Sequence, residues 1–137
     1  MKLLLDVNVV LDVLLMRRPH VEASSKILNA CEHKQFRGVV CATSVTTLYY
    51  LTQKARDRQT ANKMLERLLQ ICEVATVNDR VIQKALQAGW EDFEDAVIHE
   101  AAVLSGCDCI VTRNISDFKK AQIDVYTPDE MRTVMNV

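Results

Sequence analysis

Four aspartates are spaced so that an α/β fold would bring their carboxylates together: Asp6, Asp92, Asp95 and Asp117. Asp6 ends one apolar run, and Asp117 follows shortly after another. Asp92 and Asp95 are three residues apart and therefore share one face of a helix. Carboxylates that converge repel one another unless a cation lies between them or some of them are protonated.

The chemistry that such a group predicts is metal-assisted hydrolysis. Oxygen ligands at an octahedral site suit Mg²⁺ or Mn²⁺. Such an ion can activate water and stabilise the charge that develops on a phosphoryl group, so we expect hydrolysis of a phosphodiester. Further polar residues follow the predicted strands and are candidates for binding substrate or orienting the site: Asn8, Ser44, Thr112, Arg113 and Asn114.

Each aspartate also has an ordinary structural use. Asp6 could serve only as the cap of a following helix, and Asp92 could do the same. Asp95 could be a solvated residue of a first helical turn, where acidic residues are favourable. Asp117 could form a turn in a polar loop. Their shared position at one sheet edge is what favours a site.

Alternating strands and helices must position these residues. The expected strands are residues 2–6, 38–42, 73–77, 109–112 and 124–126. The expected helices are 8–16 with Asn8 as its cap, 20–33, 43–56 capped by Thr43 or Ser44, 60–71, 79–88, 92–105 and a last one from Pro128. Residues 114–118 are expected to form a polar loop. This alternation predicts an α/β fold whose parallel sheet has helices on both faces. Ligands of such sheets bind beyond the carboxyl ends of the strands, where the strand order reverses.

Composition limits the class of protein. The chain has 137 residues, of which 49% are hydrophobic and 26% charged, so we expect one domain over residues 1–137 rather than a disordered or fibrous protein. The 17 basic and 18 acidic residues give a net charge of -1, which excludes a large basic surface for duplex DNA but not a local basic patch.

The cellular setting follows from the cysteines and the apolar runs. Five cysteines, an odd number, all lie within or beside apolar segments, which favours reduced thiols over a disulfide framework. No apolar run approaches the roughly 20 residues that span a bilayer. Asp6 interrupts the first run too early for a signal peptide. We therefore expect a cytoplasmic protein without a membrane partner.

Three segments of the chain resemble the PIN-domain family of metal-dependent nucleases. They are DVNVVLD at the start, DFEDAVIHEAAVLSGCDCIVTRNISDF, and YTPDEM near the end. The similarity is nearest to small bacterial PilT N-terminus-like (VapC-type) proteins, which include toxin ribonucleases of toxin–antitoxin pairs. It implies a three-layer α/β/α sandwich with a central parallel sheet of about five strands. It also implies Mg²⁺ or Mn²⁺, cleavage of single-stranded RNA, a homodimer and an antitoxin partner.

The resemblance assigns residues one at a time. Asp6, Asp95 and Asp117 match the acidic residues that hold the metal. Asn8, Ser44, Thr112 and Asn114 match polar positions around such a site. Asp12 matches an acidic position of the opening motif, for which we expect a structural role in fixing loops.

One position departs from the family pattern. The family usually has a glutamate in the helix after the second strand, where Tyr50 stands in this chain. Asp92 could supply the missing charge, one turn before Asp95. Otherwise the chain would be a catalytically weak or inactive module that binds RNA or protein.

Two further sets of residues have open roles. His99 could face the site or be a capped or solvated histidine. Basic residues near the expected edge could hold phosphates beside the cleaved bond or be solvated surface charges. They are Arg17, Arg18, Arg113, Lys119 and Lys120.

Overall fold

The computed structural model describes all residues, 1–137, and contains the alternating elements that the sequence predicts. The strands are β1 (Lys2–Leu5), β2 (Arg37–Cys41), β3 (Cys72–Ala75), β4 (Cys109–Val111) and β5 (Asp124–Tyr126). The helices are α1 (Val7–Leu14), α2 (Val21–Glu32), α3 (Ala42–Ala55), α4 (Arg58–Ile71), α5 (Asp79–Ala88), α6 (Phe93–Leu104) and α7 (Pro128–Met135). A short 3₁₀ helix, η1 (Ile115–Phe118), follows β4.

All five strands form one parallel sheet in the order β3-β2-β1-β4-β5. The chain adds β2 and β3 on one side of β1 and then adds β4 and β5 on the other side. The strand order therefore reverses between β1 and β4, which is where ligands bind to sheets of this kind. Asp6 and Thr112 directly follow these two strands.

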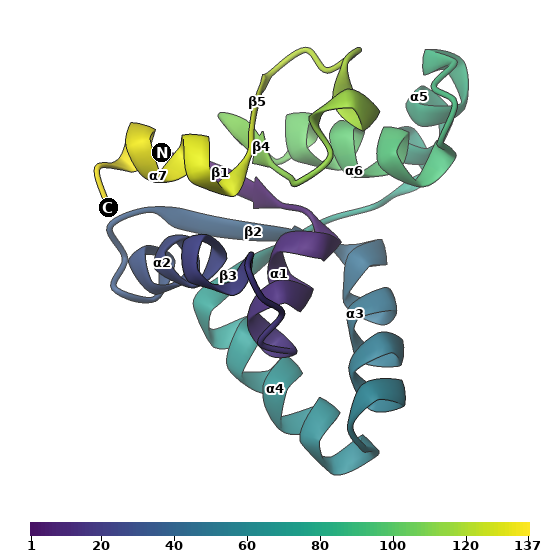
Figure 1. Cartoon of the computed structure of the whole chain (residues 1–137). Coiled ribbons are helices and arrows are strands. Elements are labelled where there is room, and N and C mark those ends of the chain that lie inside the picture. Colours follow the sequence, from purple (N-terminus) through teal and green to yellow (C-terminus); the bar gives the residue numbers. More distant parts are fainter.

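Side chains alternate along the strands and build one apolar layer on each face of the sheet. Leu3 and Leu5 of β1 pack in a core with residues of α1, α2, α3, α4 and α7. Leu4 packs on the other face with residues of α5, α6 and η1. Figure 1 shows α5 and α6 on one side of the sheet and α3 and α4 on the other. The expected three-layer α/β/α sandwich is confirmed.

Helix starts differ in detail from the expectation. Asp6, not Asn8, caps α1, because its carboxylate accepts the backbone N–H of Val7. No side chain caps α3, which begins directly after β2, so the expected cap by Thr43 or Ser44 is wrong. The expected polar loop after Asn114 contains the short helix η1, which buries Phe118. Boundaries of this kind depend on backbone geometry that the apolar pattern does not specify.

The five cysteines are all buried free thiols. Burial raises the pKa of Cys31 to about 11 and that of Cys72 to about 12, so both stay protonated at neutral pH. Gly38 of β2 lies against both of them: a Cβ at this position would be 3.0 Å from each Sγ. No helix combines the length and the hydrophobicity needed to cross a bilayer.

Candidate functional site

Asp6 is fixed at the carboxyl end of β1 by three hydrogen bonds. Its Oδ1 accepts the backbone N–H of Val7 at 2.8 Å. Its Oδ2 accepts the hydroxyl of Thr112 at 2.8 Å and the amide of Asn8 at 3.3 Å. Burial raises the pKa of this carboxyl, the bonds from Thr112, Val7 and Asn8 oppose the rise, and the charge of Asp117 adds to it. The protein therefore holds Asp6 in one orientation but leaves its charge without a cation.

Asn8 and Thr112 connect the ends of β1 and β4 where the strand order reverses. Oδ1 of Asn8 accepts the backbone N–H of Arg113 at 3.1 Å. Oγ1 of Thr112 accepts the backbone N–H of Asn114 at 3.1 Å. Of the five predicted polar residues, Asn8 and Thr112 therefore belong to the network around Asp6 through their side chains, and Arg113 and Asn114 only through their backbone N–H groups. Ser44, the fifth, is not bonded to it.

The start of α6 brings two more carboxylates to this edge. Asp92 is the cap of α6, and its Oδ1 accepts the backbone N–H of Asp95 at 3.1 Å. The pKa of Asp95 is raised to about 7, first by burial and then by the charges of Asp92, Asp6, Asp117 and Glu94. A shift of this kind requires the carboxylates to be close in space. The structure thus gathers all four aspartates that the sequence singled out.

Three of the four aspartates line a small cleft. This cleft has a volume of about 150 Å³ and is lined by Asp92, Asp95 and Asp117 together with Trp90, Glu91, Ser116, Lys119 and Lys120. Asp6 is not part of this lining, but its charge contributes to the raised pKa of Asp95. No three acidic, histidine or cysteine side chains are arranged in this conformation as a ready ligand group for a metal ion.

The helix after β2 contributes no carboxylate. Ser44, in the first turn of α3, is buried, and its Oγ has no hydrogen-bond partner. Tyr50, near the middle of α3, is 57% exposed. No acidic residue occurs between Glu32 and Asp57, so α3 cannot supply the glutamate that the family pattern has here.

Asp12 forms a buried ion cluster whose full extent the sequence did not reveal. Its side chain is fully buried. Its carboxylate accepts one hydrogen bond from Nε of Arg17 at 2.8 Å and another from Nε of Arg113 at 2.7 Å. The cluster ties α1 to the loop after β4, which also carries the backbone N–H bonded to Asn8. The motif position of Asp12 indicated a structural role, but not its two arginine partners.

His99 belongs to the core and not to the cleft. Its ring is buried, lies 5.0 Å from that of Trp90, and accepts the backbone N–H of Gln122 through Nε2 at 3.0 Å. Burial lowers the pKa of His99, although nearby Glu100 opposes the change. A neutral His99 therefore packs against Trp90, which lines the cleft.

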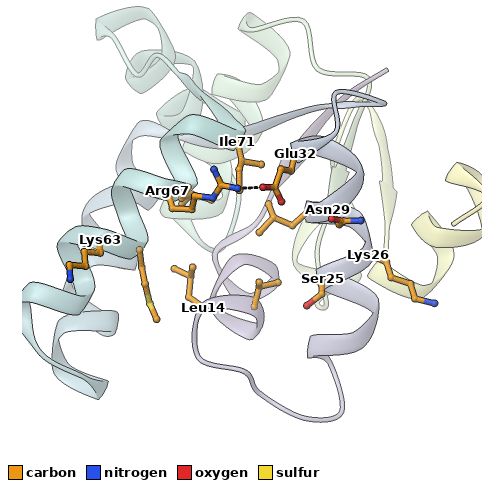
Figure 2. Close-up of a pocket in the computed structure, with 12 residues that line it drawn as sticks. Leu14, Ser25, Lys26, Asn29, Glu32, Lys63, Arg67 and Ile71 are labelled. Atoms are coloured by element: carbon orange, nitrogen blue, oxygen red, sulfur yellow. Dashed lines mark hydrogen bonds and ion pairs between the residues drawn. The ribbon is translucent and has the colours of Figure 1, made fainter.

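A second hollow lies away from the aspartates, between α1, α2 and α4. This groove has a volume of about 660 Å³. Figure 2 shows Leu14 and Ile71 among its apolar lining. Lys63 and Arg67 of α4 lie along one side, and Arg67 forms an ion pair with Glu32 of α2. The groove thus combines an apolar floor with a mainly basic rim.

Known proteins share this sequence pattern and this fold. Residues 2–116 match the family model described as PIN domain. Ribonuclease VapC1 of Aquifex aeolicus (strain VF5) is 25% identical over 134 residues, which are 94% of this chain and 92% of that protein. Two solved complexes superpose with the chain over 93% of its length and 98% of theirs. VapBC2 from Rickettsia felis, bound to a DNA fragment of its promoter, has a TM-score of 0.72 and 16% identity. DNA-bound VapBC from Salmonella typhimurium has a TM-score of 0.73 and 18% identity.

Proposed function

Because the chain belongs to the PIN domain family, we propose that it is a divalent-metal-dependent endoribonuclease that hydrolyses phosphodiester bonds of single-stranded RNA. The observation that carries the proposal is the group of carboxylates at the point where the strand order reverses. Burial and three neighbouring aspartates raise the pKa of Asp95 to about 7, as expected for a site built to receive a cation. The ribonuclease named among the relatives supports the same reaction.

The donor set fits Mg²⁺ or Mn²⁺. Asp6, Asp95 and Asp117 offer only oxygen ligands, which both ions prefer. None of the three forms an ion pair with a lysine or arginine, so their charges are not neutralised by the protein. The side chains do not form a complete ligand group in this conformation, and Asp6, Asp95 and Asp117 are the residues that would hold the ion.

The remaining residues of the site prepare these carboxylates. Thr112 and Asn8 hold Oδ2 of Asp6, which fixes the direction of its remaining lone pairs. Asp92 fixes the first turn of α6 and adds negative charge beside Asp95. When bound, a divalent ion supplies a Lewis acid for the phosphoryl oxygens and makes water a better nucleophile.

Cleavage of a fluorescently labelled single-stranded RNA tests the proposal. Wild-type protein should cleave with Mg²⁺ or Mn²⁺, stop in excess EDTA and recover when metal is restored. Asp6→Asn should abolish cleavage without unfolding the protein. Asp124→Asn is the control, because Asp124 is exposed at the amino end of β5. Cleavage by Asp6→Asn at the wild-type rate, or undiminished cleavage in EDTA, would contradict the proposal.

A second candidate function is a module that binds RNA or protein without turnover. It is favoured by α3, which has the exposed Tyr50 where the family pattern has a glutamate. Such a protein would bind without cleaving and would show no thermal shift with Mn²⁺. A shift with Mn²⁺ that Asp6→Asn removes would exclude it.

We further propose an antitoxin partner whose amphipathic segment occupies the groove between α1, α2 and α4 (Figure 2). The apolar lining suits the apolar face of a helix or strand, and Lys26 and Lys63 suit acidic flanks. A solved structure with this fold is a toxin–antitoxin complex from Klebsiella pneumoniae. The candidate partner is a short protein encoded beside this chain.

Co-expression with that protein tests the partner. Met64→Asp should prevent co-purification, because Met64 lines the groove. Leu86→Asp on α5 is the control, since Leu86 is 65% exposed and does not line the groove. Complex formation that survives Met64→Asp would contradict this binding surface.

A homodimer and a cytoplasmic location complete the proposal. Tyr50 of α3 and Leu69 of α4 are exposed apolar side chains on the two helices that follow β2, where a second copy could pack. Light scattering on the purified chain tests the dimer. The five free thiols suit a reducing compartment.

A further inference from the structure

The structure separates the basic residues near the aspartates into bonded and free ones. Arg17 and Arg113 direct their guanidinium groups to the buried carboxylate of Asp12. Lys120 donates from Nζ to the backbone carbonyl of Gly89 at 3.0 Å and so joins the loop after η1 to the end of α5. Three of the five predicted phosphate-binding cations therefore already have partners within the protein.

Lys119 differs from these three. It lines the cleft with Asp92, Asp95 and Asp117, is exposed, and forms neither an ion pair nor a side-chain hydrogen bond. Arg18 is also unpaired but does not line the cleft. Lys119 is thus the one cation lining the cleft that has neither an ion pair nor a side-chain hydrogen bond within the protein.

The backbone beneath Lys119 is held firmly, although its side chain is free. Phe118, the preceding residue, is 2% exposed and meets Trp90 edge to face, with ring centroids 5.8 Å apart. This contact anchors η1 against the wall of the cleft. A flexible lysine stem on a fixed backbone can place its ammonium group on a bound anion.

We propose that Lys119 binds a non-bridging phosphate oxygen of single-stranded RNA as the strand enters the cleft. The inference rests on the proposed function. It identifies the residue that reduces the electrostatic repulsion between the RNA phosphate and the aspartates. A phosphodiester approaching several carboxylates is repelled, and a cation on the same cleft offsets that repulsion. Contacts to phosphate position a strand without reading its bases, so Lys119 contributes affinity and not sequence preference.

Steady-state cleavage of labelled single-stranded RNA across a series of NaCl concentrations tests the contact. Lys119→Gln should raise KM about tenfold and leave kcat nearly unchanged. It should also make the slope of log(kcat/KM) against log[NaCl] less steep by about 0.7, the value for one lost phosphate contact on a single strand. Lys119→Arg should restore both KM and the slope.

Lys34→Gln is the matched control, because it removes the same charge from an exposed lysine before β2 that does not line the cleft. It should leave both KM and the salt slope at their wild-type values. A merely structural role for Lys119 would move the melting temperature and not the slope. Unchanged KM and slope in Lys119→Gln would overturn the inference.

Fluorescence anisotropy with the same RNA lets the two proposals fail separately. Binding that Lys119→Gln weakens, without cleavage by either protein, would support the lysine contact and overturn the nuclease. Cleavage by Lys119→Gln with wild-type KM and slope would overturn the contact and leave the nuclease intact. Absence of both binding and cleavage in wild type would overturn both.

Discussion

Asp95 shows how burial and neighbouring charge prepare a single residue for a ligand. Its pKa is raised to about 7 because it is half-buried and has three aspartates and Glu94 nearby. The sequence predicted this grouping because Asp6, Asp95 and Asp117 occupy positions that a parallel sheet brings to one edge. It could not predict which carboxyl would have its pKa raised most, since that depends on burial in the folded protein.

The raised pKa of Asp95 predicts a stability that falls with pH. The folded protein holds this proton more tightly than the unfolded chain, whose pKa is near the ordinary value of 3.8. The carboxyl therefore destabilises the fold progressively as pH rises from about 4 to about 7. In buffer with EDTA, Asp95→Asn should raise the free energy of unfolding by about 1–2 kcal/mol at about pH 8, a value reduced for solvent screening. The gain should vanish below about pH 4.

Urea unfolding at several pH values measures this effect. Asp124→Asn, on an exposed aspartate of β5, should show no such gain at any pH. A lower stability of Asp95→Asn than of wild type at about pH 8 would show that the ionised Asp95 carboxylate does not destabilise the fold.

Among the elements, the apolar pattern predicted every strand and α-helix, but not the 3₁₀ helix η1 or all of the element ends. The strand at 124–126 and the helix at 79–88 have the expected bounds. The helix bounds are marked in the sequence, since Asn78 caps the start of the helix and Gly89 caps its end. The cap of α1 was placed on Asn8 and lies on Asp6. Either residue type can cap a helix, and only the direction in which the chain leaves β1 decides between them.

The Asp12 cluster predicts a strong link between two elements that are distant in sequence. Asp12→Asn leaves Arg17 and Arg113 without their carboxylate and should lower the free energy of unfolding by about 3 kcal/mol. Glu73→Gln breaks an exposed pair with Arg37 and should cost less than about 1 kcal/mol. Urea unfolding of both variants measures the difference. Equal losses would mean that the buried cluster adds no more stability than a surface ion pair.

At the scale of the whole molecule, a nearly neutral protein concentrates its polar chemistry where the strand order reverses. The net charge of -1 predicted that nucleic-acid binding must depend on local charges. The sheet order β3-β2-β1-β4-β5 then places Asp6, Thr112 and the start of α6 together. The groove between α1, α2 and α4 could not be foreseen, because its lining comes from three helices whose packing no sequence period specifies.

Calorimetric titration of Mn²⁺ into the metal-free protein measures whether these aspartates form a metal site. Wild type and Asp124→Asn should show saturable binding, and Asp6→Asn and Asp117→Asn should lose it. Binding should also release protons near pH 7, because Asp95 must ionise to join the site. Undetectable binding to wild type, or equal binding to Asp6→Asn, would contradict a metal site built from these aspartates.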